Sequence, residues 1–169
     1  MPRKAQAPPT PPVDYIERTR DQYAGLGYPP YRWVELPEAP PFTPLAKPLR
    51  ECRVGLVASG GLYRVGQRAF HFKDDLSYRA IPTSTPASEL RASHFAYDTT
   101  DARQDPNVVF PVATLKDLAE VGRIGSLAPV AYTFMGGIYS ARKVRDILAP
   151  ALADALVRDE VDVAIMVPA

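Results

Sequence analysis

The densest group of side chains that could do chemistry lies in the segment SHFAYDTTDARQDPN, residues 93–107. It holds one histidine and three aspartates: His94, Asp98, Asp101 and Asp105. An imidazole beside a carboxylate can transfer a proton, and such ligands together can hold a divalent metal. The spacing matches neither the H-E-x-x-H motif of zinc enzymes nor a calcium-binding loop. Because aspartate also forms turns and caps, residue types alone favour a structural loop, then proton or substrate handling, then metal binding.

The turn Ser59-Gly60-Gly61 is a second candidate site, because it directly follows the apolar run RVGLVA. Backbone amides in such a turn can bind a carboxylate or another anion. The full dinucleotide-binding fingerprint is absent, since no third glycine at the required spacing begins a helix. Tight turns also need glycine for backbone reasons alone, so a plain turn and a ligand-binding loop both stay open.

Two further features are weaker candidates. The phrase GRIGSLAP, Gly122 to Pro129, and the pair Gly136-Gly137 suggest a second loop at the same sheet edge, with the pair as a candidate anion site. Cys52 lies between charged residues in Arg-Glu-Cys-Arg, and neighbouring arginines can lower the pKa of a thiol. It is the single cysteine of the chain, so no intrachain disulfide can form, and we expect a small core residue.

Alternating strands and helices must position these residues. Short apolar runs rich in β-branched residues predict strands, and apolar residues at helical spacing predict helices. The predicted strands are the run from Arg53, Tyr78–Ile81, Val108–Phe110 and a buried closing strand, Val161–Val167. The predicted helices are Val13–Leu26, Thr114–Val121 capped by Thr114 and Gly122, and Ser140 to about Arg158. This order predicts an α/β fold with a small, mostly parallel sheet flanked by helices.

The N-terminal part forms an extended, proline-rich arm. Ten of the 19 prolines fall between Pro2 and Pro41. We therefore expect a disordered tail over residues 1–12, then a helix and a wrapping arm over residues 13–49, anchored by Tyr28, Tyr31, Trp33 and Phe42. Residues 50–169 form the predicted α/β domain.

Composition narrows the class of protein. The chain of 169 residues carries 20 Lys and Arg against 19 Asp and Glu, so no strong electrostatic attraction to nucleic acid or an anionic membrane is expected. The first residues lack the apolar stretch of a secretory signal, and no run approaches the ~20 apolar residues of a membrane span. We expect a cytoplasmic protein.

Several phrases, taken together, resemble one family. They are VGLVASGGLY (54–63), DLSYRAIP (75–82), SHFAYDTTDARQDPNVVFP (93–111), GRIGSLAP (122–129) and YTFMGG (132–137). In order and wording they resemble the selenoprotein B components of glycine, sarcosine and betaine reductases and the related D-proline reductase subunit. The resemblance runs from about Arg53 to Ala169, and the phrase 93–111 is its most specific part.

The resemblance implies a substrate-activating component of a reductive system. In that family a selenocysteine or cysteine attacks the substrate, the C–N bond is cleaved reductively, and a further cysteine and a thioredoxin-type reductant take part. A selenolate is ionised at neutral pH, which suits it to covalent catalysis. In short members of the family the redox residue follows the strand that corresponds to VDVAIMVPA, residues 161–169.

No selenocysteine or cysteine follows this predicted strand within residues 1–169. Selenocysteine is encoded by UGA, which gene prediction commonly reads as a stop. We therefore expect that Ala169 precedes such a codon and that the chain is truncated. The alternative is a genuinely short protein that either pairs with a separate C-terminal subunit or is simply degenerate. No other cofactor is expected in the chain.

The resulting hypothesis is a reductase component whose residues build the substrate pocket, inactive on its own. His94, Asp98 and Asp101 are the candidate catalytic residues, and Ser59, Gly60, Gly61 and Asn107 the candidate substrate-binding residues. Expected partners are a small amine substrate, other reductase subunits and a thioredoxin-type reductant, in an oligomer. The alternatives are a non-catalytic scaffold subunit and a metal-dependent hydrolase that uses His94 and the aspartates.

Overall fold

The computed structural model describes residues 13–30, 34–35, 37–41 and 43–169. The chain divides into two units, Met1–Pro41 and Phe42–Ala169, which are described separately. The predictions for the tail 1–12 and for the rings of Tyr31, Trp33 and Phe42 lie outside the described residues.

The first unit contains one helix, α1 (Tyr15–Gly25), within its described part. Asp14 caps it, because its carboxylate accepts a hydrogen bond from the Glu17 amide over 3.0 Å. Gly27 follows the end of the helix with a φ of 74°, a value that glycine adopts without strain. The helix predicted over Val13–Leu26 is therefore confirmed.

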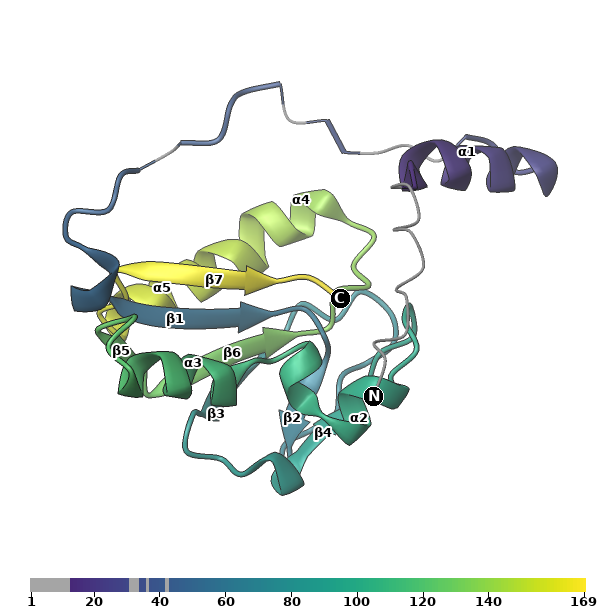
Figure 1. The fold of residues 1–169 in the computed structure, drawn as a ribbon. Coiled ribbons are helices and arrows are strands. Elements are labelled where there is room, and N and C mark those ends of the chain that lie inside the picture. Colours follow the sequence, from purple (N-terminus) through teal and green to yellow (C-terminus); the bar gives the residue numbers. More distant parts are fainter. Residues whose placement is uncertain (1–12, 31–33, 36, 42) are drawn as a thin grey trace, which may run out of the picture. The chain divides into compact units, whose positions relative to one another are not determined.

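The second unit is built on a five-stranded sheet around β1 (Arg53–Ala58) (Figure 1). Three strands pair with β1 in parallel: β7 (Val163–Val167), β5 (Ser126–Leu127) and β6 (Val130–Phe134). β5 pairs with the first two residues of β1 and β6 with the last two, so both lie on the side opposite β7. The antiparallel strand β3 (Tyr78–Pro82) pairs with β6.

Helices cover both faces of this sheet, as the alternation along β1 requires. Val54, Leu56 and Ala58 face a core that includes α3 (Val112–Glu120). Val57 faces the opposite core, which includes α5 (Ala149–Arg158) (Figure 1). The predicted α/β class, with a mostly parallel sheet and flanking helices, is confirmed.

Short elements complete the unit. A two-stranded antiparallel ribbon pairs β2 (Leu62–Arg64) with β4 (Leu90–Ala92). Four short helices precede α3 or lie before the sheet: η1 (Leu49–Glu51), η2 (Ala87–Glu89), α2 (Thr100–Gln104) and η3 (Pro106–Val108).

The segment that leads into α5 begins at Ser140, as predicted. The Ser140 hydroxyl accepts a hydrogen bond from the Lys143 amide, and α4 (Ala141–Lys143) is followed by a π-helical turn, η4 (Val144–Leu148). Pro150 lies in the first turn of α5, lacks an N–H and crowds the carbonyl four residues earlier. The wider π-helical turn accommodates this crowding without ending the helix.

Four element predictions are wrong. Val108–Phe110 is no strand: a 3₁₀ turn ends at Val108, because Asp105 caps that turn and Pro106 begins it. α3 begins at Val112, so Thr114 is not its cap, although Gly122 (φ 69°) does follow its end. Gly122–Pro129 lies at the amino end of β1, where the Gly125 amide donates to the Cys52 carbonyl over 3.0 Å, and not at the edge of Ser59.

The fourth error concerns β7. The strand exists, but it is not buried: it pairs only with β1 among the described strands, and Met166 is 62% exposed. By contrast, Cys52 is fully buried and its thiol donates to the Pro48 carbonyl over 3.4 Å, so the expected core role is confirmed. Among the residues that the structure describes, no helix is long and apolar enough to cross a membrane.

Candidate functional site

Three strand ends meet at Ser59. The carboxyl ends of parallel strands lie at the same edge of a sheet, and open α/β sheets bind ligands there. The Ser59 amide donates to the Val167 carbonyl over 3.0 Å, and the Gly136 amide donates to the Ser59 carbonyl over 3.0 Å. The Ser59 hydroxyl accepts a hydrogen bond from the Ala169 amide over 2.9 Å. The turns after β1, β6 and β7 are therefore one hydrogen-bonded unit.

The two glycines after Ser59 allow this close approach. Gly61 has a φ of 67°, and a Cβ on it would collide with the Ser93 carbonyl oxygen. A Cβ on Gly60 would lie 2.9 Å from the Val109 side chain. Packing and backbone conformation therefore favour glycine at both positions. The segment that begins at Ser93 lies directly against the turn, because no side chain separates them.

His94 lies beside this turn with one ring nitrogen unused. Its Nδ1 accepts a hydrogen bond from the Ala96 amide over 3.0 Å, so in the neutral ring Nε2 carries the proton. Nε2 is buried and has no hydrogen-bond partner among the described residues. Burial lowers the pKa of His94, since a charged ring would lose hydration there. His94 is therefore held as a neutral donor with an unfilled hydrogen bond.

The candidate catalytic aspartates, Asp98 and Asp101, do not share the buried surroundings of His94. Asp98 accepts hydrogen bonds from the Thr100 hydroxyl, over 2.6 Å, and from the Thr100 amide, and these bonds lower the pKa of its carboxyl. Asp101 is exposed in the first turn of α2. In the part of the chain that the structure describes, no hydrogen bond joins His94 to either aspartate. The local turn that residue types favoured is thus present at Asp98, and the catalytic roles stay predictions.

Asn107 fastens two elements together. Its Nδ2 donates to Asp105 Oδ1 over 2.9 Å, and its Oδ1 accepts from the Ala113 amide over 3.1 Å. The side chain joins the η3 turn to the start of α3. Its predicted contact with substrate stays a prediction.

The described residues contain no group of three or more His, Cys, Asp or Glu side chains that could hold a metal ion. The aspartates of residues 93–107 are instead engaged or exposed along the segment, as at Asp105, which accepts hydrogen bonds from the Asn107 amide and side chain.

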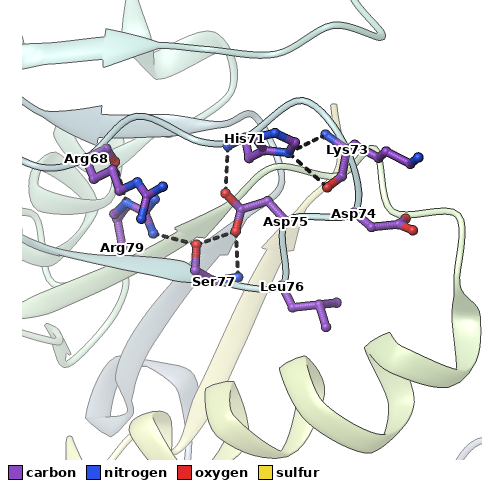
Figure 2. Close-up of a pocket in the computed structure, with 8 residues that line it drawn as sticks. All are labelled: Arg68, His71, Lys73, Asp74, Asp75, Leu76, Ser77 and Arg79. Atoms are coloured by element: carbon purple, nitrogen blue, oxygen red, sulfur yellow. Dashed lines mark hydrogen bonds between the residues drawn. The ribbon is translucent and has the colours of Figure 1, made fainter.

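A hollow of about 410 Å³, lined mostly by residues with charged side chains, escaped the sequence interpretation (Figure 2). It lies in the loop before β3, and because β3 runs antiparallel to β6, that loop reaches the same sheet edge as Gly136. Asp74 ties the loop to this edge by accepting a hydrogen bond from the Tyr139 amide over 2.8 Å. The residues that line the cavity are Arg68, His71, Lys73, Asp74, Asp75, Leu76, Ser77 and Arg79.

One carboxylate organises this loop. Asp75 accepts hydrogen bonds from the His71 amide over 2.7 Å, the Ser77 amide over 2.9 Å and the Ser77 hydroxyl. Burial alone would raise the pKa of Asp75, but these hydrogen bonds and the nearby charge of Arg79 outweigh it, so the pKa is lowered. The only sequence signal for the cavity was the concentration of charged residues between Arg68 and Arg79.

An apolar groove adjoins the same edge on the α5 face of the sheet. Two hollows of about 240 and 300 Å³ share Val57, Phe134 and Met166 in their walls, and the second reaches Ser59. Their polar surface is small, so this face between β7 and the helix is open and apolar.

Comparison with known proteins adds a family context. The model of the family described as glycine/sarcosine/betaine reductase selenoprotein B matches residues 33–169. The D-proline reductase subunit gamma of Acetoanaerobium sticklandii is 31% identical over 134 residues, which cover 79% of this chain and 55% of that relative. The chain thus spans about half the length of the curated relative that it matches. No solved structure matches.

Proposed function

The chain belongs to the glycine/sarcosine/betaine reductase selenoprotein B family, and from this membership we propose that it is a component of a reductase complex that cleaves a C–N bond of a small amine. Glycine, sarcosine, betaine, D-proline or a related compound would be the substrate. The proposal includes other reductase subunits and a thioredoxin-type reductant as partners in an oligomer.

The observation that carries the proposal is the meeting of β1, β6 and β7 at Ser59. β7 brings the chain to the turn Ser59–Gly61, and the Ala169 amide contacts the Ser59 hydroxyl. The family resemblance implies a redox residue after this strand, and the chain that carries such a residue would leave β7 beside the turn. Covalent catalysis requires such closeness between nucleophile and bound substrate.

Within this proposal, the selenocysteine or cysteine would supply the nucleophile and, with a second thiol, the two electrons that the cleavage consumes. The residues of this chain would bind and orient the substrate. His94 is suited to donate a hydrogen bond through Nε2, because that atom carries the proton and is unpartnered among the described residues. Ser59, Gly60 and Gly61 would line the substrate-binding site.

The experiment that tests the proposal is isolation of the native complex. A tag at the N-terminus, expressed in the host organism, would capture the protein with its partners, and mass spectrometry would sequence the peptide that begins in β7. We expect a selenocysteine or cysteine shortly after Ala169 and co-purifying reductase subunits. Purification without any selenol- or thiol-bearing subunit, and with no such residue in this chain, would contradict the proposal.

A scaffold role is the second candidate, and the open apolar groove beside β7 favours it. A subunit that only docks a partner would need such a face. The two candidates differ in what a substitution beside the turn should do: His94→Gln should leave the activity of the complex unchanged if the chain is only a scaffold, and should reduce it if the chain binds the substrate. Activity of the native complex with this variant separates the two.

A further inference from the structure

We propose that Tyr97 is a positioning residue for His94: its ring packs against the imidazole while its hydroxyl is bonded to the turn Ser59–Gly61, and together these contacts hold the Nε2 donor at that turn. The use of this donor on a substrate rests on the proposed function. The contacts of Tyr97 with the imidazole and with the turn are independent of it.

The contact of Tyr97 with the turn is a direct hydrogen bond. Its hydroxyl donates to the Gly60 carbonyl over 2.8 Å. Burial raises the pKa of Tyr97 and outweighs the charge of Arg103, which acts in the opposite sense, so the hydroxyl stays a donor at neutral pH. The turn is tied in its own right to β6, because the Gly61 amide donates to the Phe134 carbonyl over 3.0 Å. Tyr97 is therefore anchored to a part of the molecule that the sheet holds in place.

The contact of Tyr97 with His94 is made by the two rings. Their centres lie 4.6 Å apart, and their planes are tilted by 50°. This separation is within the range of favourable ring contacts. The ring of Phe95 lies farther from the imidazole, at 5.9 Å, and has no polar group that could anchor it. Tyr97 is thus the neighbouring ring that is itself fixed and can restrict the orientation of His94.

The restricted orientation turns the unused donor of His94 toward the turn. Nδ1 accepts a hydrogen bond from the Ala96 amide over 3.0 Å, which leaves the proton on Nε2. Cδ2, the ring carbon bonded to Nε2, would lie 3.5 Å from a Cβ placed on Gly61. The edge of the imidazole that lies against the turn is therefore the edge next to the donor.

This orientation of His94 is unfavourable without a restraint. Nε2 is buried and has no hydrogen-bond partner among the described residues, so the donor has lost water and gained nothing in return. A ring that is free to turn would expose Nε2 to water. The bond from Ala96 and the contact with Tyr97 oppose that movement. A buried, unfilled donor held beside the turn is prepared for an acceptor group of a bound substrate.

Nitrogen NMR on the full chain tests the positioning with a matched pair of variants. Tyr97→Phe and Tyr132→Phe each remove a hydroxyl that donates a hydrogen bond, but only Tyr97 lies beside His94. Tyr132 packs in the opposite core, on the α5 face of the sheet, so its variant controls for a general loss of stability. We expect Tyr97→Phe to accelerate solvent exchange of the His94 Nε2 proton at least about tenfold. It should also raise the pKa of His94 toward its ordinary value, because the ring gains contact with water, whereas Tyr132→Phe should change neither property.

The activity of the native complex tests whether Tyr97 acts through His94. Tyr97→Phe should reduce kcat/KM at least about threefold in the otherwise unchanged chain. In a chain that already carries His94→Gln, Tyr97→Phe should have no further effect, because the donor that Tyr97 positions is absent. A purely structural role of Tyr97 would reduce activity by the same factor in both chains.

Unchanged exchange and an unchanged pKa of His94 in Tyr97→Phe would overturn the inference, as would the same changes in Tyr132→Phe. Additive losses of activity from Tyr97→Phe and His94→Gln would overturn it as well. The outcome is separable from the proposed function. If Tyr97→Phe releases the His94 ring but the native complex cleaves no C–N bond, the positioning stands and the proposed function fails. If the complex is active while the His94 signals are the same in Tyr97→Phe, the proposed function stands and the positioning fails.

Discussion

The backbone amide of Ala169 donates a hydrogen bond to the hydroxyl of Ser59 over 2.9 Å. This contact joins the segment after β7 to the turn after β1, two positions separated by most of the sequence. The contact places the turn Ser59–Gly61 next to the chain that leaves β7. The proposed function is based on this closeness.

Replacement of Ser59 by alanine removes the acceptor of this bond. The Ser59 amide and carbonyl keep their contacts with Val167 and Gly136, so the fold should persist with a loss of about 1 kcal/mol or less in the free energy of unfolding. Hydrogen exchange at the amide of Ala169 should accelerate, whereas the amides of β1 should keep their protection. Unchanged exchange at Ala169 would show that the Ser59 hydroxyl does not hold this segment.

Gly61→Ala should be far more destabilising than Gly66→Ala. Both glycines have a positive φ, 67° and 90°, so each alanine incurs backbone strain of about 1–2 kcal/mol. Only at Gly61 would the added Cβ collide with a backbone carbonyl, that of Ser93; Gly66 has nothing within 4 Å of that position. Overpacking adds about 1–3 kcal/mol.

Chemical denaturation of the two variants measures this difference directly. Gly66→Ala is the matched control, since it shares the conformational strain and lacks the collision. Equal losses in both variants would mean that the segment beginning at Ser93 does not lie against the turn.

Tyr132→Phe should flatten the decline of stability at alkaline pH. Burial and then the hydrogen bond to Asp159, over 2.7 Å, raise the pKa of Tyr132. A raised pKa in the folded state contributes stability that is complete below the unfolded value of about 10 and is lost as the pH rises above it. The variant lacks this ionisation, so its unfolding free energy should fall less steeply above pH 10. At pH 7 it should be about 1 kcal/mol less stable, and equal alkaline slopes would refute the assignment.

His94 should remain neutral under conditions in which a solvated histidine begins to protonate. Because burial lowers its pKa, protonation favours the unfolded chain, so this contribution to stability is complete above about pH 6.5 and shrinks as the pH falls below it. Nitrogen NMR should show a proton on Nε2 and none on Nδ1, which accepts from Ala96. Signals typical of the opposite tautomer would contradict the arrangement at the turn.

The main sheet could be predicted where local pattern and tertiary role agree. The apolar run 53–58 predicts β1, and Asp14 and Ser140 mark the starts of helical segments because capping is a local interaction. No strand is predicted for the apolar run of β6, and the three-residue strands β2 and β4 carry too short a pattern to be recognised. Val109 and Phe110 are buried and apolar, as strand residues would be, yet a proline-initiated turn places them in the core.

The site was predictable only in part, because local patterns are visible in the sequence and tertiary contacts are not. The turn Ser59–Gly61 follows β1, and a strand end is visible in the sequence. The cavity of Arg68 and Arg79 depends on a loop that closes through Asp75 and Tyr139, and such tertiary contacts leave no periodic signal. The unpartnered Nε2 of His94 likewise follows from burial in the folded chain and not from its neighbours in sequence.

The most direct test of the central claim is cleavage of a substrate C–N bond by the native complex supplied with a dithiol reductant. Cleavage is measured as release of ammonia or an amine from glycine, sarcosine and betaine, and as ring opening to a linear primary amine for D-proline. Each substrate would be tested with wild-type protein, His94→Gln and the control Arg123→Gln. We predict dithiol-dependent cleavage of at least one substrate, a kcat/KM reduced at least about tenfold by His94→Gln, and no change with Arg123→Gln. Absence of dithiol-dependent cleavage of all four substrates, or full activity of His94→Gln, would contradict a reductase site at this edge of the sheet.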